Sequence, residues 1–270
     1  MDNTSIAFIG GGNMARALIG GLLQAGHPAR TISVADPSET ARQSAAADFG
    51  VRVTDSAAAA LDGAEVVILA VKPQVMPAVL TDLAEQLSGS PLVVSVAAGI
   101  TLASLERALG DRVGIVRAMP NTPALYGAGM TGMVANAAVD RSGRGLAEQI
   151  LAATGQTLWL EDEALMDVVT AVSGSGPAYF FALAEQLALA GERAGLSPAA
   201  AAQLARQTAF GAGLMLVESG LTAGELRMRV TSPGGTTQAA LESMGQDGFE
   251  RLVERAVGAA VRRGRELGKH

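Results

Sequence analysis

The sequence predicts an α/β protein with two parts: an N-terminal, mostly parallel sheet covered by helices, and a C-terminal part made only of helices. From Ser5 to about Leu160, short apolar runs alternate with amphipathic helical patterns, as they do in doubly wound sheets. A turn of three glycines, Gly10 to Gly12, separates the first apolar run from the first helical pattern. After Glu161 the strand-like runs stop. We therefore expect two domains, residues 1–160 and residues 161–270.

Each predicted strand is an apolar, β-branched stretch bounded by glycine, proline or polar residues. The predicted strands are Ser5–Ile9, Thr31–Ala35, Val51–Val53, Glu65–Val71, Leu92–Val96, Val113–Arg117 and Met130–Ala135. Between the strands, apolar residues recur at intervals of three and four, which predicts helices. The predicted helices of this part are Asn13–Gln24, Ser38–Phe49, Gln74–Leu87 and Thr101–Leu109.

The C-terminal part contains helical patterns and glycine-rich turns. The predicted helices are Glu163–Ala171, Pro177–Ala194, Pro198–Ser219, a helix that begins near Gln238, and Phe249–Leu267. The segment Ala178–Ala190 is apolar on nearly every side, and a domain of about 100 residues seldom buries such a helix alone. We therefore expect a homodimer at least, built by these helices.

Composition narrows the classes of function. The chain has 26 acidic and 20 basic residues, and this net charge of −6 argues against nucleic acid as a partner. Cysteine is absent, which excludes disulfides, thiolate metal sites and thiol catalysis. The only histidines are His27 and His270. A buried histidine base therefore has almost no candidate, and no metal site is predicted.

Nothing in the sequence predicts a membrane location. The first residues, Met1 to Ser5, lack the basic start and the apolar run of a secretory signal. The segment Ala178–Ala190 has 13 residues and contains Glu185, so it is too short and too polar to span a bilayer. We expect a cytoplasmic protein with no membrane partner.

The glycine turn matches the pattern G-x-G-x-x-G/A, with Gly10, Gly12 and Ala15 at the small positions. Gly10 would allow the tight turn, Gly12 would let a pyrophosphate approach the backbone, and Ala15 would let the helix lie close to the strand. The alternative is a tight turn that binds nothing. Because a predicted strand precedes the motif and a predicted helix follows it, we favour dinucleotide binding.

Asp36 ends the second predicted strand, where an acidic residue accepts hydrogen bonds from the adenosine ribose of NAD. It would also repel the 2′-phosphate of NADP. The sequence Asp36-Pro37-Ser38 is equally typical of a helix cap, and Arg42 is the nearest arginine after the strand. The choice between NADH and NADPH therefore stays open.

Further candidates follow the strands at the same predicted edge of the sheet. Lys72, the only internal lysine, comes directly after a strand and before Pro73, where ligands bind in open α/β sheets. A solvated surface lysine is the alternative. Small residues around Ala98 would leave room for a nicotinamide ring. Asn121 would hydrogen-bond the nicotinamide carboxamide or only cap its own loop.

A second candidate site lies in the segment Val230–Thr237, where two glycines lead into a helical pattern. Consecutive N–H groups at such a place bind anions without a cationic side chain, and a substrate carboxylate would suit them. Thr236 and Thr237 add hydroxyls that would hold a nitrogen nearby. A capped helix start without a ligand is the alternative.

Five segments together resemble one family, the pyrroline-5-carboxylate reductases, over essentially the whole chain. The segments are Phe-Ile-Gly-Gly-Gly-Asn-Met-Ala, Ala-Val-Lys-Pro, Met-Pro-Asn-Thr-Pro, Ala-Val-Ser-Gly-Ser-Gly-Pro-Ala-Tyr and Val-Thr-Ser-Pro-Gly-Gly-Thr-Thr. The resemblance implies reduction of 1-pyrroline-5-carboxylate to L-proline with NADPH, NADH or both, the last step of proline biosynthesis. It also implies an N-terminal Rossmann domain, a helical domain that interlocks with its twofold mate, and a substrate site at that interface. Larger rings of dimers are often formed in the family.

The resemblance also assigns roles to residues. The residues implied at the pyrophosphate are Gly10, Gly12, Asn13 and Met14. Those implied at the nicotinamide half are Val71, Lys72, Pro73 and Ala98. Those implied around the substrate are Glu163, Ser232, Gly235, Thr236 and Thr237, with Thr237 bonded to the ring nitrogen as the catalytic residue. Ala57 departs from the family, in which asparagine is common near the adenosine ribose, so the adenosine contacts are less well defined.

The scarcity of histidine and lysine agrees with imine reduction, because a protonated imine needs no base to accept a hydride. Related β-hydroxyacid dehydrogenases carry a lysine in their glycine-rich interdomain helix, and Gly174–Phe180 has none. Such a dehydrogenase, or another imine reductase of related fold, is the alternative enzyme. A non-catalytic nucleotide-binding protein would explain the glycine turn but not the second anion loop.

Overall fold

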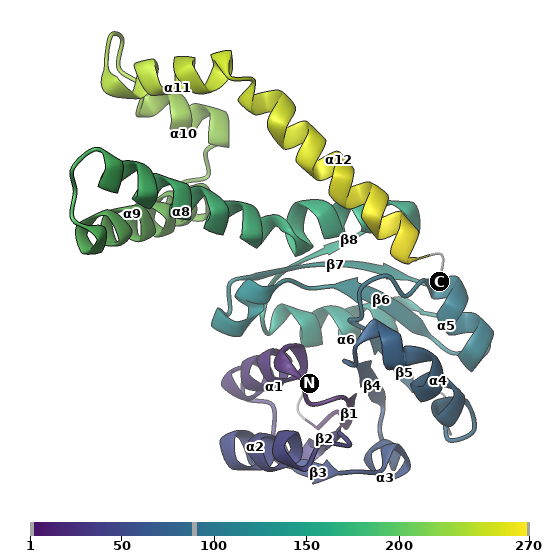
Figure 1. Ribbon diagram of the computed structural model, residues 1–270. Helices are drawn as coiled ribbons and strands as arrows, with labels where there is room; N and C mark the ends of the chain where they lie inside the picture. The colour runs from purple at the N-terminus through teal and green to yellow at the C-terminus, as the bar shows by residue number, and fades with distance from the viewer. Residues whose placement is uncertain (1–2, 88–90, 269–270) are drawn as a thin grey trace. The chain divides into compact units, whose positions relative to one another are not determined.

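The computed structural model describes residues 3–87 and 91–268 (Figure 1). The chain divides into two compact units. The first unit comprises Met1–Gly174 and Ala260–His270, and the second comprises Ser175–Ala259.

The described part of the first unit contains an eight-stranded sheet in the order β3-β2-β1-β4-β5-β6-β7-β8. The strands are β1 (Ile6–Ile9), β2 (Ile32–Ala35), β3 (Arg52–Thr54), β4 (Val66–Leu69), β5 (Leu92–Ser95), β6 (Ile115–Met119), β7 (Gly129–Ala135) and β8 (Gly155–Trp159). Neighbouring strands are parallel except for β6 and β7, which pair antiparallel. The order of the first six strands is that of a doubly wound dinucleotide-binding sheet, so the predicted fold class is confirmed.

Helices cover both faces of this sheet. They are α1 (Asn13–Gln24), α2 (Glu39–Phe49), α3 (Ala57–Leu61), α4 (Met76–Ala84), α5 (Leu102–Leu109), α6 (Arg141–Ala152) and α7 (Met166–Val169). Buried side chains of α1, α2 and α6 form one core with the sheet, and those of α3, α4, α5 and α7 form the other. Short 3₁₀ turns occupy Ala29–Thr31, Pro73–Val75, Thr122–Tyr126 and Glu163–Leu165, and a π-helical turn occupies Thr170–Gly174.

Some elements differ from the sequence prediction. The strand β8 was not predicted as an element because it alternates half-buried and exposed residues and lacks an apolar run. The helix α6 was missed because two glycines and two arginines interrupt its apolar pattern. The predicted helix Gln74–Leu87 begins later, as α4, because proline stands near its start at Pro77 and again at Pro73 of the preceding 3₁₀ turn.

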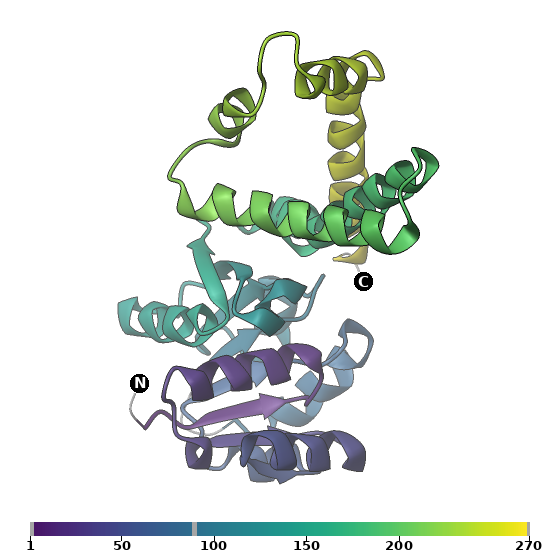
Figure 2. The same ribbon diagram turned by 90° about the vertical axis from the view of Figure 1, so that its left-hand side faces the viewer.

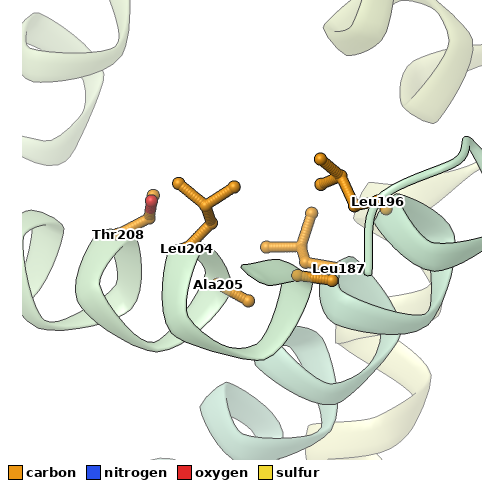
Figure 3. Close-up of a pocket in the computed structure, with 7 residues that line it drawn as sticks. Leu187, Leu196, Leu204, Ala205 and Thr208 are labelled. Carbon is orange, nitrogen blue, oxygen red and sulfur yellow. The ribbon is translucent and has the colours of Figure 1, made fainter. Parts of the chain in front are cut away.

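The second unit consists of helices: α8 (Gly176–Arg193), α9 (Pro198–Glu218), α10 (Ala223–Arg229), α11 (Thr236–Gln246) and the start of α12 (Phe249–Leu267). Ser197 accepts a hydrogen bond from the N–H of Ala200, so the predicted cap of α9 is present. The helices α8 and α9 lie side by side (Figure 2). They border an apolar groove of about 200 Å³ that includes Leu187, Leu196 and Leu204 (Figure 3).

The second unit has almost no core of its own. In residues 175–259, all of which the structure describes, the buried apolar side chains are Ala201, Ala205 and Leu226. By contrast, large apolar side chains are exposed along α8 and α9, including Phe180 at 63% and Phe181 at 66%. An isolated soluble unit rarely presents such a surface to water.

The first unit continues past the domain border predicted at residue 160, as far as Gly174, and takes in the chain again from Ala260. Residues 161–174 pack on its sheet: Met166 and Ala171 are fully buried. A Cβ on Gly132 of β7 would lie 2.6 Å from Cγ1 of Val169, so α7 and β7 are in close contact. The predicted border relied on the change from strand-like to helical patterns, which does not reveal what a helix packs against.

Within the described ranges, no helix is long and apolar enough to cross a membrane. Nor do these ranges contain a group of three or more His, Cys, Asp or Glu side chains placed to hold a metal ion.

Candidate functional site

The glycine turn lies at the carboxyl end of β1. Gly10 has a φ of +100°, and a Cβ there would lie 2.7 Å from the carbonyl oxygen of Ala70, so the turn requires glycine at this position. A Cβ on Gly12 would meet no atom within 4 Å. Gly12 is the N-cap of the 12-residue α1 and supplies no side chain to cap the first N–H groups. The start of α1 therefore faces open space and suits an anionic pyrophosphate.

Asp36 is attached to this turn. Its Oδ2 accepts a hydrogen bond from the N–H of Gly11 at 2.7 Å, and its Oδ1 accepts one from the N–H of Ser38 at 2.8 Å. Ser38, and not Asp36, caps α2 by accepting from the N–H of Ala41. The helix cap that the sequence allowed for Asp36 is thus supplied by Ser38. Asp36 instead connects the residues that follow β1 and β2.

Arg42 folds back from α2 to the end of β2. Its guanidinium donates to the carbonyl oxygens of Asp36 at 2.8 Å and of Pro37 at 3.0 Å. A carboxylate and a guanidinium therefore lie together where the adenosine ribose of a dinucleotide would lie. This arrangement is compatible with either NADH or NADPH.

The parallel strands bring most of the predicted cofactor residues to one edge of the sheet. Strands β1, β2, β4, β5 and β6 run in the same direction, so the residues that follow them share the carboxyl edge. These residues are Gly10, Asp36, Val71, Lys72, Pro73, Ala98 and Asn121. Lys72 is exposed and has no polar partner among the described residues. Ala98 is also exposed, on the short loop between β5 and α5.

Asn121 ties its loop to the π-helical turn. Its Oδ1 accepts a hydrogen bond from the N–H of Met130 at 2.9 Å. Its Nδ2 donates to the carbonyl oxygen of Ser173 at 3.1 Å and to that residue's Oγ at 3.3 Å. Both ends of the amide are engaged within the protein, which favours the loop-capping interpretation over a contact with the nicotinamide carboxamide.

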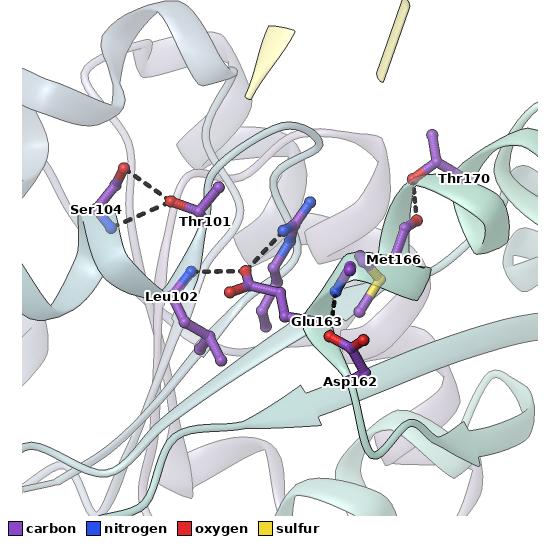
Figure 4. A network of polar contacts seen from close by, with 9 residues as sticks. Thr101, Leu102, Ser104, Asp162, Glu163, Met166 and Thr170 are labelled. Carbon is purple, nitrogen blue, oxygen red and sulfur yellow. Dashed lines mark hydrogen bonds and ion pairs between the residues drawn. The ribbon is translucent and has the colours of Figure 1, made fainter. Parts of the chain in front are cut away.

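Glu163 belongs to a polar network in the first unit (Figure 4). Its Oε1 accepts a hydrogen bond from the N–H of Leu102 at 2.8 Å and pairs with Arg117 Nη1 at 2.7 Å. Arg117 lies on β6 and is only 5% exposed, and Leu102 is the first residue of α5. The carboxylate of Glu163 thus joins β6, α5 and its own 3₁₀ turn.

The second predicted site, residues 230–237, lies in the second unit. Gly234 has a φ of +70°, which favours glycine, and a Cβ on Gly235 would lie only 3.0 Å from the carbonyl oxygen of Ser232. The N–H of Gly235 donates to that oxygen at 3.0 Å, and the N–H of Gly234 donates to Oε1 of Gln238 at 2.8 Å. Both glycine N–H groups are therefore used inside the loop, contrary to the expectation that they bind the anion.

The N–H groups left for an anion are those at the start of the 11-residue α11. No side chain caps this helix. The first backbone N–H that donates at its start is that of Ala239, which bonds to the carbonyl oxygen of Gly235. Thr236 and Thr237 occupy its first two positions, with Thr237 half-buried. Backbone donors and the Thr237 hydroxyl thus occur on the same helical turn. A substrate with a carboxylate next to a nitrogen would need both kinds of group close together.

Arg117 and Ser173 are among the participants in these networks that were not predicted from the sequence. Arg117 does carry a signal, because a charged residue within an apolar strand needs a buried partner. Ser173 carries none, because its carbonyl and hydroxyl groups become acceptors for Asn121 only through the π-helical turn.

Comparison with known proteins identifies the family. Residues 163–267 match the family model described as pyrroline-5-carboxylate reductase dimerisation, and residues 5–99 match one described as NADP oxidoreductase, coenzyme F420-dependent. The chain is 51% identical to pyrroline-5-carboxylate reductase of Pseudomonas aeruginosa, over 99% of this chain and 98% of the relative. The chain belongs to the pyrroline-5-carboxylate reductase family.

Solved structures of the family have the same fold. The pyrroline-5-carboxylate reductase of Coxiella burnetii superposes with a TM-score of 0.95 at 40% identity and covers 100% of both chains. The pyrroline carboxylate reductase of Plasmodium falciparum, solved with NADP bound, superposes with a TM-score of 0.87 at 30% identity over 99% of both chains. The family resemblance found in the sequence is thus confirmed along the full chain.

Proposed function

We propose that this chain reduces 1-pyrroline-5-carboxylate to L-proline with NADPH or NADH, the last step of proline biosynthesis. A hydride adds to the carbon of the protonated C=N bond, the π electrons move to nitrogen, and a secondary amine results. The observation that supports this most strongly is the 51% identity to a pyrroline-5-carboxylate reductase over 99% of the chain. That length includes both the glycine turn and the loop 230–237.

The carboxyl edge of the sheet fits a dinucleotide cofactor, which supplies the hydride when it is bound. The open approach at Gly12 and the uncapped start of α1 suit the pyrophosphate, which Asn13 and Met14 would also contact. Asp36 and Arg42 would meet the adenosine ribose. Residues that follow β4 and β5 would line the nicotinamide half: Val71, Lys72, Pro73 and Ala98.

The loop before α11 and the first turn of this helix would hold the substrate. The backbone N–H groups of Thr236 and Thr237 would bind the carboxylate at the positive end of the helix dipole. Ser232 and Gly235 shape the loop through the hydrogen bond between them. The Thr237 hydroxyl would hydrogen-bond the ring nitrogen and orient the C=N carbon toward the hydride.

The reaction does not require a histidine base. His27 is 5% exposed and hydrogen-bonds Thr31 through Nε2 at 2.9 Å, just before β2. It therefore lies at the amino edge of the sheet, opposite the predicted cofactor edge. The protein's own contribution is then orientation of the imine and stabilisation of its positive charge until the hydride neutralises it.

The active form we propose is a homodimer or a ring of such dimers in the cytoplasm. The matched dimerisation segment contains the exposed apolar side chains of α8 and α9. A second copy of the chain packed on them would supply the core that residues 175–259 lack. In this arrangement the substrate site would be completed at the interface between the two copies.

The deciding experiment is turnover of 1-pyrroline-5-carboxylate by the purified chain, followed by loss of NADPH or NADH absorbance and by proline formation. We expect one proline per cofactor oxidised. Small β-hydroxyacids with the oxidised cofactor serve as the control substrates. Turnover of a hydroxyacid in place of the imine would replace this function with that of a dehydrogenase, and binding of cofactor with no turnover of either would indicate a nucleotide-binding protein.

A further inference from the structure

The loop between β5 and α5, residues 96–101, carries the predicted nicotinamide contact Ala98. It leaves the carboxyl edge of the sheet through Gly99, whose φ of +77° requires glycine. Ala98 is exposed, and contacts from outside the loop help to hold its end and its middle. Two groups do so, and they come from widely separated parts of the chain.

The first group is the carboxylate of Glu163, which fixes the end of the loop. Thr101 caps α5 by accepting from the N–H of Ser104, but this leaves the N–H of Leu102 without a partner inside the helix. Glu163 Oε1 accepts from that N–H at 2.8 Å (Figure 4). A carboxylate is favourable at this end of a helix, and buried Arg117 holds it there at 2.7 Å.

The second group is the last turn of α12, which contacts the middle of the loop. A Cβ on Gly99 would lie 3.4 Å from Cβ of Leu267 and 3.7 Å from its carbonyl group, so the contact is with the main chain and Cβ of this residue. The helix can approach closely because the buried Gly264 has no side chain: a Cβ there would lie 3.0 Å from Oδ1 of Asp167 on α7. Larger side chains at these two glycines would push α12 away from the loop.

Glu163 and Leu267 are the first and last residues of the segment that matches the dimerisation model. Both ends of that segment therefore meet at one loop of the dinucleotide-binding sheet. We propose that Glu163 and the last turn of α12, at Leu267, are positioning groups that hold the loop 96–101 against the nicotinamide half of the cofactor. This proposal rests on the proposed function, which places Ala98 against the nicotinamide. In this role Glu163 acts through the loop, and not on the substrate as the family resemblance implies.

The test compares the whole cofactor with a fragment that lacks the nicotinamide. NADPH is paired with 2′-phospho-ADP-ribose, or NADH with ADP-ribose, and each Kd is measured by calorimetry on the full-length chain. We expect Glu163→Leu, and Gly264→Leu, which pushes α12 away from the loop, to weaken binding of the whole cofactor by about tenfold and leave fragment binding within about twofold of the parent. Turnover of 1-pyrroline-5-carboxylate should fall by about 10- to 100-fold in kcat, because a misplaced nicotinamide slows hydride transfer.

Matched variants separate this role from a general loss of stability. Glu163→Gln keeps an oxygen acceptor for Leu102 and should retain most of the affinity and turnover. Glu161→Leu changes an exposed glutamate that has no polar partner among the described residues, and it should behave like the parent. Arg263→Ala, in an exposed ion pair on the same end of α12, is the control for Gly264→Leu. Sedimentation should give the same assembly for all of them.

Three outcomes would overturn the proposal. A raised KM for pyrroline-5-carboxylate with unchanged cofactor affinity in Glu163→Leu would place Glu163 on the substrate. Equal weakening of cofactor and fragment would indicate a general structural role. If Glu163→Leu does not fold, parent-like binding of the whole cofactor by Gly264→Leu decides against the loop contact. A parent that binds cofactor but never reduces the imine would refute the proposed function only, because the binding comparison remains valid.

Discussion

At Thr237 and its neighbours, internal hydrogen bonds decide which groups remain for a ligand. The two glycine N–H groups of the loop 230–237 are used by the Ser232 carbonyl and the Gln238 side chain. The first N–H groups of α11 and the Thr237 hydroxyl remain at its start. The same reasoning applies to Asn121, whose amide is engaged at both ends within the protein.

We predict that Thr237→Ala loses about one to three orders of magnitude in kcat/KM for pyrroline-5-carboxylate, because it removes a group that orients the reacting centre. Cofactor binding, measured by fluorescence, should be normal. Thr237→Ser keeps the hydroxyl and should recover most of the activity. Parent-like turnover in Thr237→Ala, or loss of cofactor affinity along with activity, would refute our placement of the substrate.

Asp36 is the residue that we expect to influence cofactor choice. Replacing it in Asp36→Ser removes a negative charge from the predicted ribose site and leaves Arg42 next to it. The ratio of NADPH to NADH efficiency should rise by about fivefold, the effect expected for one solvated charge pair. Asp55→Ser, at an exposed position, is the control. An unchanged ratio in Asp36→Ser would show that Asp36 only connects the ends of β1 and β2 and does not influence cofactor choice.

At the scale of elements, the glycine turn and α1 were predictable because local sequence determines them. The turn needs glycine at a left-handed position, and the predicted helix Asn13–Gln24 is found with the same bounds. The network of Glu163 was not predictable. Its carboxylate meets the N–H of Leu102 and the guanidinium of Arg117 only after strand order and the 3₁₀ turn bring distant segments together. Sequence periodicity shows which face a helix buries but not which groups it meets there.

The two outer glycines of the turn should fail in different ways. Gly10→Ala places a Cβ 2.7 Å from a carbonyl oxygen at a φ of +100°, so it should destabilise the protein by about 2 kcal/mol or more. Gly12→Val meets no neighbouring atom and should melt like the parent, yet abolish cofactor binding. Calorimetric unfolding and cofactor titration of both variants measure the difference. Normal cofactor binding by Gly12→Val would contradict the pyrophosphate site.

The start of α10 should depend on pH. The Thr222 hydroxyl and N–H donate to Glu225 at 2.7 Å and lower the pKa of this carboxyl below its usual value. A lowered pKa adds stability that is present above the usual pKa near 4.5 and is lost as the pH falls through the lowered value. A titration followed by NMR should show this shift. In Thr222→Val the hydroxyl bond is lost, and the pKa of Glu225 should move back toward its usual value.

At the scale of the whole molecule, the two units differ in how they are stabilised. The first buries two apolar cores against an eight-stranded sheet, whereas residues 175–259 bury three apolar side chains. The apolar character of Ala178–Ala190 therefore could be recognised from the sequence, but the surface that covers it could not, because a single sequence does not specify contacts with a second copy. The segment lies within residues 163–267, which match the dimerisation model of the family.

We predict that dimerisation depends on the exposed aromatic pair of α8, Phe180 and Phe181. Replacing one of them in Phe180→Asp would place a charge in an interface that excludes water, so the dimer should dissociate. Sedimentation velocity at micromolar concentration should show a monomer, and turnover of pyrroline-5-carboxylate should fall at least about tenfold, because a site at the interface would be incomplete. The control, Arg141→Glu, changes charge at an exposed position on α6 of the first unit and should remain dimeric and active. A parent chain that sediments as a stable, fully active monomer would show that the helices after Glu161 cover their apolar faces in another way.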